Sequence, residues 1–277
     1  MSYLISHNNN SFSNSFEISG SKSESNRLLI LNSIYGNLKI DNLSNSDDTV
    51  ILDKYLTSLE NQIDVHHAGT AMRFLTALLS IKTNKQFVIT GSNRMKERPI
   101  KILVDALNKL GANISYCDKN GYPPLMIKGQ EIVGGEISLS SQISSQYISA
   151  LMLIAPILKK GLLINLEGQI TSKPYLEMTL AILKKIGINC YFKKNIISIE
   201  SCSTINSSSI SIESDWSSLS YFYSIIALSS SSKLNIGTFY KSSIQGDIRL
   251  SEIYIKLGVE TKFIESSSRI SLKKIND

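Results

Sequence analysis

One pattern occurs three times along this chain and limits the folds that it can adopt. Each copy is an amphipathic helix, a glycine, and then a strand in which polar and apolar residues alternate. The copies are residues 100–116, 176–192 and 248–263, and their glycines are Gly111, Gly187 and Gly258. Glycine commonly closes a helix because it adopts the left-handed conformation without steric cost. A period of about 70 to 76 residues therefore predicts one structural unit that is repeated.

A second series of helices is interleaved with the first. Residues 68–80, 144–158 and 214–230 begin with small polar residues suited to a helix N-cap and continue with mostly apolar ones. Helices that are apolar around most of their circumference are buried. The sequence therefore predicts an α/β fold whose units have the order strand, buried helix, strand, half-exposed helix and further strands. Three units end near residue 236, and a fourth begins at Gly237 with one helix and one strand.

The composition excludes several classes of protein. The chain has 277 residues, of which 42% are hydrophobic and 19% charged, as is typical of a globular protein with a sizeable core. Its longest nearly apolar run, residues 148–158, is well short of the ~20 residues that a membrane-spanning helix needs. The N-terminus has neither a cationic nor an apolar signal region, so we expect a cytoplasmic protein. Cys117, Cys190 and Cys202 lack metal-ligand or redox spacing, and we interpret them as reduced thiols.

The net charge of +6 at pH 7 leaves two classes of partner open. A basic protein can bind nucleic acid, but here Lys and Arg are spread along the chain without a cluster of basic and aromatic residues. Small anionic substrates account for the excess charge equally well. We therefore expect no nucleic acid and no membrane among the partners. His66 and His67 have no further ligands nearby in the sequence, and we expect no metal.

The first of five helix N-termini that carry possible anion ligands lies near residue 24. Lys22, Ser23 and Arg27 surround it, and backbone N–H groups and the helix dipole there favour a phosphate or carboxylate. The spacing is not that of a P-loop. The alternative interpretation is a serine-capped helix with solvated charges.

Two further N-termini combine an arginine with a glycine or a proline. Gly69 permits a close approach to the start of a helix that also carries Arg73, and we interpret Arg73 as part of a buried ion pair. Pro99 suits the first turn of the next helix, so Arg98 lies at its start. Arg98 is either a ligand or part of a solvated run of charges.

The last two N-termini are rich in hydroxyl groups. Ser144, Ser145 and Gln146 offer hydroxyl, amide and backbone donors together, and Ser172 and Tyr175 lie at the start of another helix. Each motif alone is more often a helix cap than a site. A repeated fold would point equivalent helix starts at one place, so the five N-termini together favour a shared anion site.

Six sequence blocks carry a resemblance to a known family. They are GSKSESNR, AGTAMRFL, RMKERPI, SSQYISALM, SKPY and SIQGDIR. In this order and spacing they resemble the 5-enolpyruvylshikimate-3-phosphate synthases, from about residue 10 to the end of the chain. The enolpyruvyl transferases that act on UDP-N-acetylglucosamine share the fold but lack a block like residues 22–27.

The resemblance implies a particular architecture. It is an α/β fold of two domains, each with three βαβαββ units around a pseudo-threefold axis, known as the enolpyruvyl transferase-like inverse α/β barrel. The resemblance places one complete domain at residues 20–236. Residues 1–19 and 237–277 would form part of the second domain, so the chain would correspond to about the N-terminal two-thirds of the enzyme.

The resemblance also implies an activity, the transfer of the enolpyruvyl group of phosphoenolpyruvate to the 5-hydroxyl of shikimate 3-phosphate. Phosphate is released, no cofactor is needed, and the full-length enzyme is a monomer. Lys22, Gly69 and Arg98 would contact phosphoenolpyruvate, with Gln146 between the two substrates. The residues implied for shikimate 3-phosphate are Ser23, Arg27, Ser144, Ser145, Ser172 and Tyr175. Both substrates carry a carboxylate and a phosphate, which cationic and N–H donors bind.

The chain departs from the family pattern in two ways. His67 stands where the family usually has Asn, and Phe74 where it commonly has Pro, and we expect both beside the phosphoenolpyruvate site. The family's Asp base and its Lys-Glu-Thr-Asp-Arg block would lie beyond Asp277. The resemblance therefore implies no catalytic residue within this chain and no turnover by the chain alone. The competing hypothesis is a non-catalytic anion-binding domain.

Overall fold

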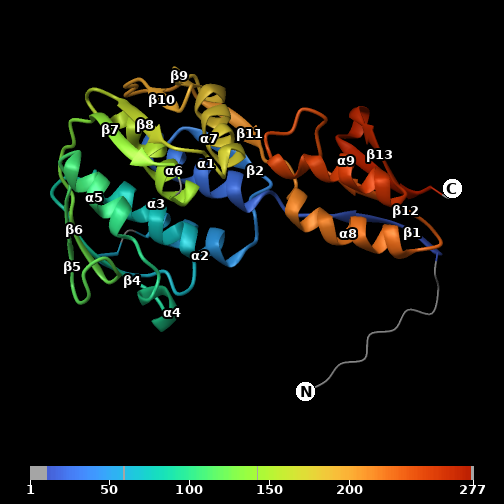
Figure 1. The fold of residues 1–277 in the computed structure, drawn as a ribbon, viewed down its shortest axis with the longest axis horizontal. Helices are drawn as coiled ribbons and strands as arrows, with labels where there is room; N and C mark the ends of the chain where they lie inside the picture. The colour runs from blue at the N-terminus through green and yellow to red at the C-terminus, as the bar shows by residue number, and fades with distance from the viewer. Residues whose placement is uncertain (1–10, 59, 142, 276–277) are drawn as a thin grey trace. The chain divides into compact units, whose positions relative to one another are not determined.

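The computed structural model describes residues 11–58, 60–141 and 143–275. It divides into two compact units, each with its own strands and helices (Figure 1). The larger unit is residues 22–210, and the smaller unit combines the segment up to Ser21 with the segment from Ser211 onward. The chain thus leaves the smaller unit after one strand and returns to it after residue 210.

The larger unit contains two four-stranded sheets with the same topology. Their strand orders are β3-β4-β6-β5 and β7-β8-β10-β9. In each sheet the first two strands are parallel and the others pair antiparallel. Each sheet is one βαβαββ unit, as the repeat predicts. The strands are β3 (Gln62–Asp64), β4 (Gln86–Thr90), β5 (Asn113–Tyr116), β6 (Leu125–Lys128), β7 (Gly135–Ser140), β8 (Leu162–Glu167), β9 (Cys190–Lys193) and β10 (Ile196–Ile199).

The helices of the larger unit differ in how deeply they are buried. All 12 residues of α3 are buried, and α6 is buried from Tyr147 to its end. These two helices pack against each other and against α1 (Figure 1). The helices are α1 (Lys22–Tyr35), α2 (Asp47–Thr57), α3 (Gly69–Ser80), α4 (Asn93–Lys96), α5 (Lys101–Lys109), α6 (Ser145–Ile154), η1 (Ala155–Ile157) and α7 (Lys173–Lys185). A two-stranded sheet pairs β2 (Leu38–Asp41) with β11 (Ser208–Ser211).

The glycines that define the repeat have the backbone conformation that the sequence predicts. Gly111, Gly187 and Gly258 have φ angles of 108°, 89° and 75°. A residue with a side chain is strained in this left-handed region, so glycine allows each helix to end and the following strand to begin. The prediction that these three glycines end their helices in the left-handed conformation is confirmed.

The smaller unit contains a third four-stranded sheet, ordered β1-β12-β14-β13. β1 and β12 are parallel and the other pairs are antiparallel, so the topology matches that of the two other sheets. Its first strand comes from the N-terminal segment and the rest from the C-terminal segment. The elements are β1 (Ser11–Glu17), α8 (Trp216–Leu228), β12 (Ser231–Gly237), η2 (Gly246–Arg249), α9 (Leu250–Tyr254), η3 (Ile255–Leu257), β13 (Val259–Ile264), η4 (Glu265–Ser267) and β14 (Arg269–Lys274).

The division between the units differs from the one we expected. The resemblance placed residues 20–236 in one domain, and the repeats suggested a fourth unit that begins at Gly237. Instead, Trp216 and Leu234 share one apolar core with Ile270. The helix that we expected before Gly258 is also broken into η2, α9 and η3. The reason is the pairing of β12 with β1, which brings residues before and after Gly237 into one sheet.

The core of the smaller unit includes a buried carboxylate. Glu213 is buried and accepts hydrogen bonds from Trp216 Nε1 at 2.8 Å and Tyr240 N at 2.9 Å. The side chains of Ser243 and Gln245 donate two more. Burial raises the pKa of Glu213, although these hydrogen bonds act in the opposite direction. Its contribution to stability is therefore fully present below its unfolded pKa and is lost as the pH rises through the folded pKa.

We expect Glu213→Gln to remove this pH dependence and to destabilise the smaller unit. The amide nitrogen would replace an oxygen that accepts hydrogen bonds, and each unmatched buried donor costs about 1 to 3 kcal/mol. Trp216 is the sole tryptophan of the chain and donates to Glu213, so urea unfolding followed by its fluorescence reports on this site. Measurements at about pH 4 and about pH 8 compare the free energy of unfolding near the ordinary pKa of a glutamate and well above it. The exposed Glu252→Gln is the control, and the same pH slope in both variants would contradict the assignment.

Three features concern the described residues as a whole. No helix among them is long and apolar enough to cross a membrane. They contain no group of three or more His, Cys, Asp or Glu side chains that could hold a metal ion. Cys117, Cys190 and Cys202 are free thiols, and Cys117 is exposed.

Candidate functional site

Arg27, in the second turn of α1, joins three helices of the larger unit. Its Nε donates to Thr179 Oγ1 of α7 at 2.7 Å, and its Nη2 donates to Ser149 Oγ of α6 at 3.0 Å. The same guanidinium group donates to the backbone carbonyls of Ser23 at 2.7 Å and Tyr175 at 3.3 Å. The first turns of α1 and α7 therefore meet at this group, beside α6.

The charge of Arg27 is held by neutral acceptors, two hydroxyls and two carbonyls. The side chain is 3% exposed, and burial lowers its pKa to about 10, against the opposite effects of Tyr175 and Glu24. It therefore stays protonated near neutral pH. A cation in such a low-dielectric position attracts an anion more strongly than one in water does. The arrangement favours a phosphate or carboxylate at the starts of these helices.

A second set of contacts links the start of α6 to the start of α3. Ser144 is the N-cap of α6, and its Oγ accepts a hydrogen bond from Gln146 N at 3.3 Å, as expected for a helix cap. Gln146 Nε2 donates to Thr70 Oγ1 at 3.5 Å. Thr70 N donates in turn to Asp48 Oδ1 at 3.1 Å. The amide of Gln146 therefore lies between the two helix starts.

Gly69, the first residue of α3, lies directly against Arg98. A Cβ atom at Gly69 would come within 2.5 Å of Nη1 and 3.0 Å of Nη2 of Arg98. Glycine is therefore required for the guanidinium group to approach this helix N-terminus. The carbonyl of Pro99 accepts a hydrogen bond from Tyr147 Oη, which ties the segment of Arg98 to α6.

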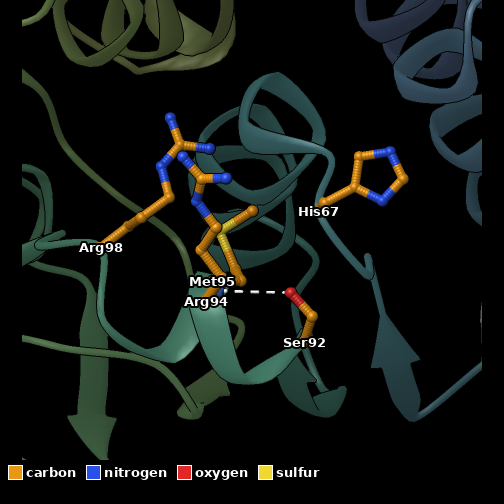
Figure 2. Close-up of a pocket in the computed structure, with 5 residues that line it drawn as sticks. All are labelled: His67, Ser92, Arg94, Met95 and Arg98. Carbon is orange, nitrogen blue, oxygen red and sulfur yellow. Dashed lines mark hydrogen bonds between the residues drawn. The ribbon is translucent and has the colours of Figure 1, made fainter. Parts of the chain in front are cut away.

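Arg98 lines a pocket of about 430 Å³ together with His67, Ser92, Arg94 and Met95 (Figure 2). The side chains of Arg94 and Arg98 extend in the same direction, and the ring of His67 points away from them. Ser92 caps the short helix α4 by accepting a hydrogen bond from Met95 N at 3.3 Å. The two cations make this pocket suited to a small anion.

Arg73 is buried next to this pocket, but not in the ion pair that we expected. Its Nη1 donates to the carbonyl of Gly69 at 3.0 Å and to Met95 Sδ at 3.6 Å. No carboxylate among the described residues forms a salt bridge with it. Burial lowers the pKa of Arg73, and the charge of Arg98 lowers it further. Its position in the apolar helix α3 explains the difference, because the backbone carbonyls of α3 lie nearer to it than any carboxylate.

The structure places seven of the predicted site residues in two sets of contacts. Arg27 donates to the carbonyls of Ser23 and Tyr175 at the starts of α1 and α7. The other set, around the starts of α6 and α3, contains Ser144, Gln146, Gly69 and Arg98.

Three predicted residues stand apart from these contacts. Lys22 is the exposed first residue of α1, Ser145 is the first residue of α6, and Ser172 is the N-cap of α7. Among the described residues, their side chains form no hydrogen bond or ion pair with the rest of the set. Their roles stay predictions.

The two departures from the family pattern have different surroundings. His67 lines the pocket of Arg98, and its Nε2 lies 3.3 Å from Asp47 Oδ2. Phe74 does not line this pocket. It is buried in the second turn of α3, and its ring centre lies 5.6 Å from the guanidinium carbon of Arg27. The reason is that this face of α3 packs against α1.

Sequence reasoning missed several residues that build the site. Ser149 and Thr179 hold Arg27, Tyr147 holds the segment of Arg98, and Arg94 adds a second cation to the pocket. A hydroxyl within an otherwise apolar, buried helix was the signal for Ser149. Arg94 belongs to the same run of charges as Arg98, but the direction of its side chain could not be read from the sequence.

The fold and the site define a class of protein. It is an α/β protein of repeated βαβαββ units in which helix N-termini and arginines form sites suited to small anions. Comparison with known proteins gives the family. The profile described as EPSP synthase (3-phosphoshikimate 1-carboxyvinyltransferase) matches residues 51–275. The chain belongs to the EPSP synthase family, as its sequence blocks predicted.

Individual relatives agree with this assignment. The 3-phosphoshikimate 1-carboxyvinyltransferase of Bacteroides fragilis is 43% identical over 255 residues, which cover 92% of this chain and 62% of the relative. The Histophilus somni protein of the same name is 34% identical and is covered over 66% of its length. The solved EPSP synthase from Acinetobacter baumannii has a TM-score of 0.75 at 19% identity over 95% of this chain and 64% of that one, which shows the fold alone. The chain thus spans about 62% to 66% of the length of these relatives.

Proposed function

We propose that this chain is part of an enzyme that transfers the enolpyruvyl group of phosphoenolpyruvate to the 5-hydroxyl of shikimate 3-phosphate and releases phosphate. The observation that carries the proposal is the buried guanidinium group of Arg27, which neutral acceptors hold where α1, α6 and α7 meet. Such a cation favours a phosphate or carboxylate, and both substrates carry both groups. Membership of the EPSP synthase family selects this pair of substrates among small anions.

The two parts of the site divide between the two substrates in this proposal. The pocket of Arg98 and Gly69, with Lys22, binds phosphoenolpyruvate, and Gln146 lies between the substrates because its amide joins α6 to α3. The residues proposed for shikimate 3-phosphate are Ser23, Arg27, Ser144, Ser145, Ser172 and Tyr175. We also propose that the units are arranged around a pseudo-threefold axis. The enzyme would act without a cofactor, as a monomer in the cytoplasm.

Binding of shikimate 3-phosphate to this chain tests the proposal. The Arg27 contacts all lie within the larger unit, so we expect the ligand to bind without the remainder of the family's length. A ligand at a hundred times its dissociation constant stabilises the native state by about 2.7 kcal/mol. The melting temperature should therefore rise in millimolar shikimate 3-phosphate and much less in shikimate. Equal shifts with the two compounds, or no shift with either, would contradict an anion site.

Gly69→Ala should weaken phosphoenolpyruvate binding while leaving shikimate 3-phosphate binding unchanged. The added methyl group would overlap the guanidinium group of Arg98, which must move away from the start of α3. We expect the KM for phosphoenolpyruvate to rise at least about tenfold, or ~1.4 kcal/mol. Kinetics are measured on this chain joined to the remaining segment of the Bacteroides fragilis relative. A normal KM would show that Arg98 does not contact this substrate.

The competing function is an anion-binding domain without catalysis. Its support is the chemistry of the site, because helix N-termini and arginines bind anions without accepting protons. Measurements on the joined protein also distinguish enolpyruvyl transfer from anion binding without catalysis. Binding of shikimate 3-phosphate without any turnover after joining would favour the non-catalytic domain.

A further inference from the structure

The smaller unit contains a pocket of about 190 Å³ that has no part in the proposed reaction. The loop after β12 contributes residues 239–242 to its lining, and the β13–β14 hairpin contributes Phe263, Glu265 and Ser268. Phe239 N donates a hydrogen bond to the carbonyl of Ser268 at 2.8 Å, which joins the two segments. The volume corresponds to about six water molecules at ~30 Å³ each. A molecule of the size of a free amino acid therefore fits in it.

This pocket and the pocket of Arg98 occupy similar places in the repeated topology. β4 and β12 are each the second strand of a parallel pair, and the segment after each strand lines a pocket. The segment after β4 contributes the two cations Arg94 and Arg98. The segment after β12 contributes the cation Lys241, and the hairpin adds the carboxylate of Glu265. The two pockets are therefore suited to ligands of different charge.

Aromatic rings form the apolar part of the pocket. Phe239 is buried and Phe263 is half-buried, and both belong to or pack against the core of the smaller unit. Their ring centres lie 5.1 Å and 6.3 Å from that of Trp216. The position of both rings is therefore fixed by packing. An apolar group that binds against them is removed from water, which is favourable.

The buried carboxylate of Glu213 fixes the loop that carries Lys241. Glu213 accepts hydrogen bonds from Tyr240 N at 2.9 Å and from the side chain of Ser243. The residues on both sides of the pair Lys241 and Ser242 are thus tied to the core. A ligand that binds to a loop already held in place loses less free energy to ordering.

Among the described residues that line the pocket, Lys241 and Glu265 are the charged ones. Both are exposed, and they come from the two different segments. Within the described part of the chain, neither forms a salt bridge with the other or with a third residue. Glu265 would repel a small anion, and Lys241 would repel a small cation. A ligand that carries both an ammonium and a carboxylate group is attracted by both.

We propose that this pocket binds a free α-amino acid with a large aliphatic side chain. The α-ammonium group pairs with Glu265 and the α-carboxylate with Lys241, while the side chain packs against Phe239 and Phe263. A longer peptide exceeds the volume of the pocket. An amino acid with a polar side chain would bring groups that need hydrogen bonds against rings that offer none.

Binding of L-leucine to this chain tests the proposal. Trp216 is the sole tryptophan of the chain and its ring contacts Phe239, so its fluorescence reports on a ligand there. We expect a saturable change with a dissociation constant of about 1 mM or below, and saturation transfer to the leucine methyl protons by NMR. Isopentylamine lacks the carboxylate and isocaproate lacks the ammonium, so each should bind at least about fivefold more weakly. Equal binding of the three compounds, or no saturation transfer to leucine, would overturn the proposal.

Three variants connect the binding to the two charges. Lys241→Gln and Glu265→Gln should each weaken leucine binding at least about fivefold, and Glu265→Gln should strengthen isocaproate binding because a repelling carboxylate is gone. Lys233→Gln is the matched control, because Lys233 is an exposed lysine of the same unit that does not line the pocket. A loss in the control equal to that in the other two, or no loss in either of them, would overturn the proposal. These measurements involve neither substrate nor turnover, so their failure is distinct from failure of the proposed function.

Discussion

Arg27→Met should lower the affinity of this chain for shikimate 3-phosphate by at least about 100-fold, or ~2.7 kcal/mol. Methionine keeps an unbranched apolar stem but removes the charge and all five N–H donors. Charge-assisted hydrogen bonds are strong at a buried position, where water does not compete for the guanidinium group. The fold should persist, because Ser149 Oγ and Thr179 Oγ1 lie 3.1 Å apart and can hydrogen-bond to each other without Arg27.

Titration calorimetry on three variants checks this prediction. Arg94→Met removes the same charge from the pocket of Arg98, so shikimate 3-phosphate affinity should stay within about twofold of the original. Arg27→Lys keeps the charge but loses the planar fork, and an intermediate loss is expected. Thermal melting of each variant shows that the fold is intact. An unchanged affinity in Arg27→Met would assign the guanidinium group to a structural link between α1, α6 and α7.

The repeated elements could be predicted because each depends on neighbours along the chain. An apolar face with a period of 3.6 residues, followed by Gly111 or Gly187, defines a helix and its end locally. Ser144 is a similar case, since a serine before an apolar helix is a common N-cap. The structure confirms these elements within about one turn.

The assembly of the third sheet could not be predicted in the same way. β12 could be recognised as a strand, but its partner β1 is the first strand described in the chain. Periodicity shows that a strand has two faces and does not show which strand lies beside it. The boundary between the units follows from this pairing and differed from expectation. We also expected α8 to be buried on most sides, but only four of its 13 residues are buried.

The helix starts that form the site could be predicted from the sequence, but the atoms that contact one another there could not. Helix N-termini rich in Ser, Gly and Arg indicate anion binding by general electrostatics. The partners of Arg27 include the backbone carbonyls of Ser23 and Tyr175. Because every residue has such a carbonyl, the sequence does not show which carbonyls accept hydrogen bonds from Arg27. Phe74 could not be placed either, because its contact with Arg27 depends on the packing of α3 against α1.

This chain alone should release no phosphate above background from phosphoenolpyruvate and shikimate 3-phosphate. In the proposed reaction the 5-oxygen forms a bond to C2 of phosphoenolpyruvate, the bond from C2 to the phosphate oxygen breaks, and the hydroxyl proton ends on the released phosphate after an acid or base has moved it. A positioned acid or base contributes about 10² to 10⁴ in rate to such a step. The arginines of the site bind and polarise anions but do not accept protons, because a guanidinium group stays charged.

Two of the carboxylates near the site have structural partners instead. Asp48 accepts a hydrogen bond from Thr70 N at 3.1 Å, and Asp47 lies 3.3 Å from His67 Nε2. We therefore expect phosphate release to begin when the remaining segment of the Bacteroides fragilis relative is joined to this chain, and Arg27→Met in the joined protein to abolish it again. A coupled phosphate assay on the three proteins measures this. Rapid release by the unjoined chain would mean that a base lies within it, and Asp48→Asn would then show whether Asp48 is that base.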